Sequence, residues 1–238
     1  MKKILQAATA AFFPKTCAAC GAIVPEEEWL CENCRGEIVR CDAASRCIVC
    51  GLPKKQCACK NRLFRFEGCV APFVNTETAW KAMIRYKYRD GASCARFFAE
   101  QMAECIRKEY AGIAFDGICF VPMHRRKQFQ RGSQPARRIA ESLAEILNLP
   151  LEHKLLVCKR YEKRAQHELN FEGRRENVRD LYGTVGSAEG KTLLLIDDIK
   201  TSGFTLDECA KELLNAGASA VWCATALITY PKRKEKKV

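Results

Sequence analysis

From residue 64 onward, short apolar runs alternate with stretches of helical spacing. The apolar runs predict β-strands at residues 66–75, 115–122, 154–159, 191–198 and 220–228. Helices are predicted at 77–88, at 93–110 with Ser93 as its cap, at 136–147 and at 205–214, where Gly217 ends the last one. This alternation favours an α/β fold, with a mostly parallel central sheet and helices on both faces.

In the first 60 residues the regular feature is the spacing of the cysteines, not the spacing of apolar residues. They hold nine of the sixteen cysteines, mostly as close pairs. Two cysteines two residues apart can bind one tetrahedral ion, and two such pairs complete a shell of four sulfur ligands. The spacing predicts two zinc sites, one formed by Cys17, Cys20, Cys31 and Cys34, the other by Cys47, Cys50, Cys57 and Cys59.

Alternatives to this assignment stay open. Cys57 and Cys59 are closer than the usual pair, so Cys41 can replace one member of the second quartet. Disulfides or an iron–sulfur cluster are further alternatives, but paired spacing suits zinc better. Neither His nor Asp lies where a catalytic zinc would keep an open position, so the zinc is predicted to be structural. Other cysteines lie in apolar runs and are predicted to be buried: Cys69, Cys119 and Cys223.

These patterns divide the chain into three regions. Residues 1–62 are predicted as an N-terminal amphipathic helix and a zinc-binding module, 63–230 as the α/β domain, and 231–238 as a basic tail. The start of the chain resembles a signal peptide, but Pro14 and Lys15 stand where a cleavage site is needed. No apolar run is long enough to span a membrane. We therefore expect a cytoplasmic protein.

The formal charge of +12 is concentrated in a few stretches. Between Arg125 and Arg138 there are six Lys or Arg and no acid. Between Lys154 and Arg179 there are eight against four acids. Such stretches attract phosphates, on small molecules or on nucleic acid, although a merely solvated surface is the alternative.

The stretch LLLIDDIKTSGFTL at residues 193–206 carries the candidate chemistry. A buried strand followed by a polar loop and a helix places that loop at the carboxyl end of the sheet, where α/β folds bind ligands. Asp197 and Asp198 suit the two hydroxyls of a ribose, unless they only end the strand. The helix start and the glycine suit a phosphate. We expect a sugar with vicinal hydroxyls and a 5′-phosphate, and no P-loop motif is present.

This stretch resembles the phosphoribosyl pyrophosphate (PRPP) motif of type I phosphoribosyltransferases. The resemblance implies that fold, a central mostly parallel sheet with flanking helices. It also implies that Asp197 and Asp198 hold the ribose hydroxyls. By the same resemblance, the 5′-phosphate is bound by the loop of Lys200, Thr201, Ser202, Gly203, Phe204 and Thr205.

Further segments narrow the resemblance to the ComF (competence protein F, GntX-like) family. They are the cysteine pairs, IRYKYRDG with Lys87, VPMHRRKQFQRGSQPA with Arg131, and KRYEKRAQHELNFEGRRENV with Arg160, Gln166 and Arg174. One departure concerns the usual Arg-Gly-Phe/Tyr-Asn-Gln, which is Arg131-Gly132-Ser133-Gln134-Pro135 in this chain.

The resemblance implies an enzyme that transfers a phosphoribosyl group from PRPP and releases pyrophosphate, with Mg²⁺ as the ion that accompanies PRPP. Five residues are candidates for the pyrophosphate side or for a lid: Lys87, Arg131, Arg160, Gln166 and Arg174. ComF relatives are associated with DNA uptake in natural competence. The alternative is therefore a non-catalytic factor that binds single-stranded DNA or a nucleotide, with other competence proteins as partners. The aromatic residues available for base stacking are few: Phe129, Tyr161 and Phe171.

Overall fold

The computed structural model describes residues 14–57, 59, 64–89, 91–161, 176 and 178–230. Its main sheet contains β1 (Gly68–Val70), β2 (Phe73–Val74), β3 (Gly117–Phe120), β6 (Thr192–Lys200) and β7 (Ala220–Ile228). The order is β1-β7-β6-β3, β2 also pairs with β7, and every pairing in this sheet is parallel. The predicted parallel sheet is confirmed.

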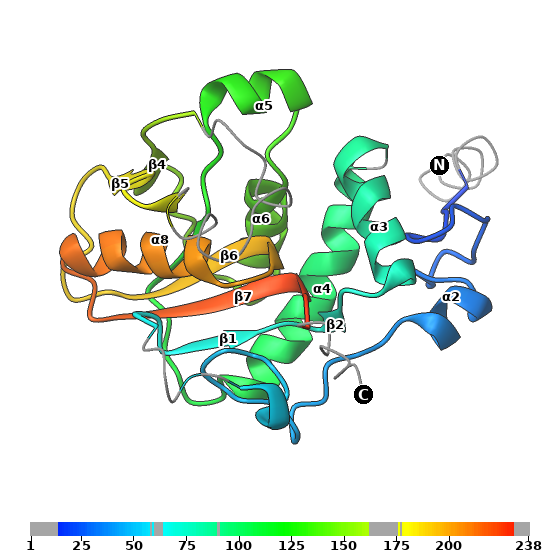
Figure 1. The fold of residues 1–238 in the computed structure, drawn as a ribbon. Coiled ribbons are helices and arrows are strands. Elements are labelled where there is room, and N and C mark those ends of the chain that lie inside the picture. The colour runs from blue at the N-terminus through cyan, green and yellow to red at the C-terminus, as the bar shows by residue number, and fades with distance from the viewer. Residues whose placement is uncertain are drawn as a thin grey trace, which may run out of the picture.

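Helices cover both faces of this sheet (Figure 1). In β6, Leu194 and Ile196 belong to the core shared with α3 (Glu77–Tyr88), α4 (Gly91–Glu109) and α6 (Pro135–Leu147). Leu193 and Leu195 belong instead to the core under α8 (Phe204–Asn215). Because neighbouring strand residues point to opposite faces, a strand buried on both sides is apolar throughout.

The helix ends agree with the sequence signals in most places. α3 covers the predicted residues, and Asn148 in the left-handed conformation (φ 53°) ends α6. Gly217 (φ 98°) follows α8. Ser93 was expected to cap the second helix, but α4 begins at Gly91, so Ser93 lies inside it.

A second, two-stranded sheet lies beside the first. β4 (Leu156–Cys158) was predicted as a strand, but it pairs antiparallel with β5 (Tyr182–Thr184) and not with the main sheet. Leu156 and Tyr182 pack in the core under α8. A short helix, α5 (Arg125–Arg131), lies in the basic stretch, and Figure 1 shows it at the top of the view, above α6 and β6.

The described part of the N-terminal module contains α2 (Glu32–Glu37) and η1 (Lys54–Gln56). Its apolar side chains belong to the core of α3 and α4, and they include Val24, Leu30 and Ile38. Its backbone also borders β1 and β2: Val74 N donates to Val39 O at 2.9 Å, and Cys69 N to Ile48 O at 3.0 Å. The module and the α/β domain therefore share one core.

The predicted N-terminal helix and the basic tail lie outside the described residues. Within the described ranges, no helix has the length and hydropathy that crossing a bilayer would require.

Candidate functional site

The carboxyl end of β6 carries the two aspartates into a tight turn. The strand continues to Lys200, two residues beyond the predicted end, so Lys200 is not part of the loop as expected. Its side chain is buried, with 2% exposed. The turn therefore consists of residues 201–203, and α8 begins at Phe204, close to the predicted start at Thr205.

Lys87 reaches this strand end from the last turn of α3. Its Nζ lies 2.5 Å from Asp198 Oδ2, and both side chains are mostly buried. The structure thus brings together a lysine and an aspartate that are far apart in the chain. The sequence had nominated both for the same site.

The two aspartates differ in charge state. Burial, followed by the negative charge of Asp198, raises the pKa of Asp197 well above its ordinary value. Burial by itself would raise the pKa of Asp198. The Lys87 ammonium and the Ile199 N–H lower it by more, so the pKa of Asp198 lies below its ordinary value. When the pair holds one proton, that proton therefore resides preferentially on Asp197, and Asp198 is the carboxylate.

Gly203 shapes the turn before α8. Its φ of 84° is in the left-handed region, which favours glycine. A Cβ at this position would lie 3.2 Å from the ring of Phe64 and 3.1 Å from Lys200 Cε. Arg65 braces the helix start, because its backbone N–H and its guanidinium both donate to Asp207, at 2.7 and 2.9 Å.

Arg131, at the end of α5, belongs to the same neighbourhood. Its guanidinium carbon lies 5.8 Å from the centroid of the Tyr88 ring, and its charge contributes to the lowered pKa of Asp198. Tyr88 is 62% exposed and follows Lys87 directly. Sequence reasoning overlooked Tyr88. Side chains two residues apart on a helix point in different directions. Because Tyr86 is buried, Tyr88 faces solvent, and the spacing of the two tyrosines could have predicted this.

The remaining candidates are not gathered at the aspartates. Arg160 is exposed and donates a hydrogen bond to the backbone carbonyl of Arg179. Gln166 and Arg174 lie outside the described residues. The departure at residues 133–135 has a structural role, because Pro135 opens α6 and its carbonyl accepts a hydrogen bond from the Tyr86 hydroxyl.

The two predicted cysteine quartets are both assembled. In each, the four sulfur atoms lie within 4.8 Å of one another. Three of the sulfur pairs are separated by 3.7–3.9 Å: Cys20–Cys31, Cys50–Cys57 and Cys47–Cys59. A tetrahedral zinc with ~2.3 Å Zn–S bonds requires about this separation. The geometry fits zinc in the predicted assignment, and Cys41 belongs to neither quartet.

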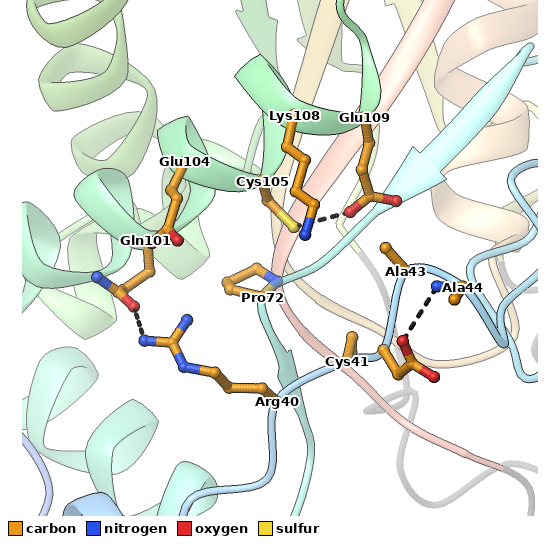
Figure 2. A pocket seen from close by; sticks show the side chains of 11 residues that line it. Arg40, Cys41, Ala43, Ala44, Pro72, Gln101, Glu104, Cys105, Lys108 and Glu109 are labelled. Carbon is orange, nitrogen blue, oxygen red and sulfur yellow. Dashed lines mark hydrogen bonds between the residues drawn. The ribbon is translucent and has the colours of Figure 1, made fainter.

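Cys41 instead lines a cavity of about 380 Å³ between the module and α4 (Figure 2). Arg40 and Gln101 are hydrogen-bonded at its rim, at 2.5 Å. Burial raises the pKa of Cys41 to about 11, so the thiol stays protonated at neutral pH. None of the PRPP-motif residues lines this cavity.

Comparison with known proteins bears on both parts of the chain. A family model described as a double zinc ribbon domain matches residues 8–66, and one described as a phosphoribosyl transferase domain matches residues 130–238. The chain is similar to the competence protein ComFC of Bacillus subtilis (strain 168). The two are 25% identical over 218 residues, which cover 87% of this chain and 86% of that protein. The chain belongs to the ComF family.

The chain is also similar to the DNA utilization protein YhgH of Escherichia coli (strain K12). The chain is 28% identical to it over 110 residues, which are 45% of this chain and 48% of that protein. The match thus spans about half the length of this relative.

Among solved structures, the chain is similar to the glutamine PRPP amidotransferase from B. subtilis complexed with ADP and GMP. The identity is 22%, the TM-score is 0.40, and the match covers 60% of this chain and 30% of that one. The parallel sheet, the cysteine quartets and the two family models establish the ComF chain as a phosphoribosyltransferase-like fold preceded by a double zinc ribbon.

Proposed function

We propose that this ComF chain binds PRPP, or another ligand containing ribose 5-phosphate, at the carboxyl end of β6 and transfers the phosphoribosyl group with release of pyrophosphate. The observation that carries the proposal is the ion pair between Lys87 and Asp198 beside the turn at Gly203. A carboxylate, a cation and the start of a helix lie together at the carboxyl end of β6. A phosphorylated ribose needs a carboxylate for its hydroxyls, and a helix start and a cation for its phosphates.

In this proposal the aspartates recognise the ribose. Asp198 is a carboxylate and accepts a hydrogen bond from one ribose hydroxyl. Asp197 is the more readily protonated of the two, and in its protonated form it can donate to a ribose oxygen. The turn and the first residues of α8 hold the 5′-phosphate through backbone N–H groups and hydroxyls: Thr201, Ser202, Gly203, Phe204 and Thr205.

Lys87 and Arg131 are proposed to serve the pyrophosphate. When a ribose hydroxyl occupies Asp198, Lys87 exchanges its carboxylate partner for the pyrophosphate oxygens. A cation beside those oxygens stabilises the negative charge that develops as the bond from the anomeric carbon breaks. Carboxylate oxygens are ligands that Mg²⁺ prefers, so Asp198 suits this ion, which would neutralise pyrophosphate charge when bound.

The test is pyrophosphate release from PRPP with a panel of nucleobases, compared with calorimetric binding of PRPP. Release that needs both a base and Asp198 supports transfer. Binding without release would leave a PRPP-binding protein, and absence of both would contradict the proposal.

A second candidate function is binding of single-stranded DNA or a nucleotide without chemistry. Exposed aromatic rings in and near the arginine-rich helix α5 favour this candidate. Phe129 is 90% exposed, and Arg126 lies 5.4 Å from the centroid of the Tyr161 ring. Exposed aromatics with cations suit stacked bases, and the names of the relatives refer to DNA utilization and competence. We therefore extend the proposal to a role in DNA uptake, together with other competence proteins.

This second candidate predicts electrostatic binding. Affinity for single strands is expected to fall steeply between about 50 and 200 mM salt, with little dependence on sequence. Phe129→Ala is expected to weaken binding, and Val185→Ala, at another exposed apolar side chain, is the control. Absence of binding at low salt would remove this candidate.

A further inference from the structure

Lys200 is a buried cation for which the described residues provide no counter-ion. Its side chain is 2% exposed, and within the described ranges no hydrogen bond or ion pair involves its ammonium. The Phe64 ring centroid is 5.9 Å away, at the outer limit of a cation–π contact, so it compensates little. Burying an unpaired ammonium is costly, which requires an explanation at this position.

The ammonium lies against the inner side of the turn before α8. A Cβ built on Gly203 would lie 3.5 Å from Lys200 Nζ. The amino end of a 12-residue helix begins at the next residue, and that end carries the positive pole of the helix dipole. Two sources of positive potential therefore meet at residues 200–204.

The described acids near this point do not compensate for that potential. Asp207, the acid in the first turn of α8, is held by Arg65. Asp198 is paired with Lys87, and among the described residues no ion pair joins Asp197 to Lys200. The combination of a buried cation and a helix start is thus arranged for an anion that comes from outside the chain.

We propose that Lys200 is the buried counter-charge for a phosphate group held at the turn of residues 201–204. The phosphate lies on the outer side of the turn and the ammonium on the inner side. Their attraction acts through the protein interior, where charges are poorly screened, and does not need a direct hydrogen bond. The assignment of a ribose 5-phosphate rests on the proposed function, whereas the anion site itself does not.

Packing is the competing explanation for Lys200, because its methylene stem fills the space beneath Gly203 next to Phe64. A methionine would fill that space without the charge. Lys200→Met therefore separates the two roles, and Lys200→Gln gives a second uncharged variant if the first does not fold. Lys191→Met is the matched control, because Lys191 immediately precedes β6 at its other end and is paired with Glu152.

The experiment measures thermal midpoints and calorimetric binding with inorganic phosphate, ribose 5-phosphate and PRPP. Inorganic phosphate is expected to stabilise the wild type and Lys191→Met. In Lys200→Met its binding is expected to weaken about tenfold or more, the scale of one unit charge facing a phosphate. The ligand-free Lys200→Met protein is expected to be at least as stable as the wild type, because an unpaired buried charge has been removed.

Each outcome decides something different. Phosphate binding by Lys200→Met or Lys200→Gln at wild-type strength would overturn the role of Lys200, even if PRPP still binds. A wild type that binds no phosphate-bearing ligand would overturn both proposals. Phosphate binding that depends on Lys200, without any binding of ribose 5-phosphate or PRPP, would keep the anion site and reject the proposed function.

Discussion

Asp197 and Asp198 are adjacent in sequence and have opposite electrostatic surroundings. Asp198 faces the Lys87 ammonium, whereas burial and its charged neighbour raise the pKa of Asp197. The same substitution at the two positions should therefore affect ligand binding to different extents and stability in opposite directions. This difference distinguishes a functional pair from two acids that merely end a strand.

Asp198→Asn should weaken PRPP binding by about ten- to a hundredfold, because it loses a charge-assisted hydrogen bond to the ribose. Asp197→Asn should weaken binding less, because the amide that replaces a protonated carboxyl group can still donate a hydrogen bond. Calorimetry with the two variants and the wild type measures this. Lys211→Met, at a partly exposed lysine on α8, is a control that should bind normally. Undiminished binding by both variants would place the ligand elsewhere.

The stability of the ligand-free variants should diverge with pH. The folded pKa of Asp197 is raised, so the wild type loses stability as pH rises from about 4 towards that pKa, and Asp197→Asn does not. The folded pKa of Asp198 is lowered, so its contribution is present above about pH 4 and is lost as pH falls. At pH 7, Asp197→Asn should raise the thermal midpoint and Asp198→Asn should lower it. Shifts in the same direction would contradict this account.

Gly203 allows a third test at the scale of a residue. Gly203→Ala and Gly190→Ala both place a side chain at positive φ, which costs about 1–2 kcal/mol at either site. Only the Cβ at Gly203 would meet other atoms, those of Lys200 and Phe64. Gly203→Ala should lose at least as much stability as Gly190→Ala, but only Gly203→Ala should lose affinity for ribose 5-phosphate. Equal affinities would show that the turn does not contact the phosphate.

At the scale of elements, predictability follows the amount of apolar patterning. β7 was predicted with its observed bounds, and α3 likewise, because a buried strand and an amphipathic helix have clear periods. α5 was not predicted, since its residues are almost all polar and none is buried. The pairing of β4 with β5 depends on contacts with α8, which local sequence does not reveal.

In the candidate site, too, local sequence patterns could be predicted and tertiary contacts could not. The motif at the end of β6 was readable because its acids, turn and helix are consecutive. Lys87 was a candidate only through the family resemblance, and its contact with Asp198 was not predicted, since it depends on how α3 packs against the sheet. The position of Lys200 was mistaken because the strand continues beyond its acids, and a lysine after two polar residues suggests a loop.

α3 carries two lysines that provide a matched comparison. Lys87 pairs with Asp198 in the site, while Lys81 pairs with Glu77 on the exposed surface. Lys87→Met should weaken binding of PRPP more than that of ribose 5-phosphate, because the lysine is proposed to serve the pyrophosphate. Lys81→Met should change neither. If Lys87→Met weakened both ligands equally, Lys87 would act only by positioning Asp198.

At the scale of the whole molecule, the zinc module is continuous with the α/β domain. Leu30 and Ile38 of the module share the core of α4, and the buried guanidinium of Arg46 pairs with Glu109 of that helix. A metal site that holds these groups in place should stabilise the whole chain rather than one end.

Elemental analysis should therefore find about two zinc ions per chain. Chelation should lower the thermal midpoint of the complete protein, with loss of signals from both the module and the sheet in one transition. A folded, metal-free sample would contradict this. One ion per chain would show that the quartet with Cys57 and Cys59 does not bind metal.

The backbone bonds between the module and β1–β2 have one more consequence. Arg40 pairs antiparallel with Phe73, so the module covers a strand edge that would otherwise present unpaired N–H and C=O groups. An uncovered edge recruits strands from other molecules. Chains synthesised during zinc starvation should therefore aggregate through β2 before they lose their helices, which makes metal supply a determinant of solubility as well as of stability.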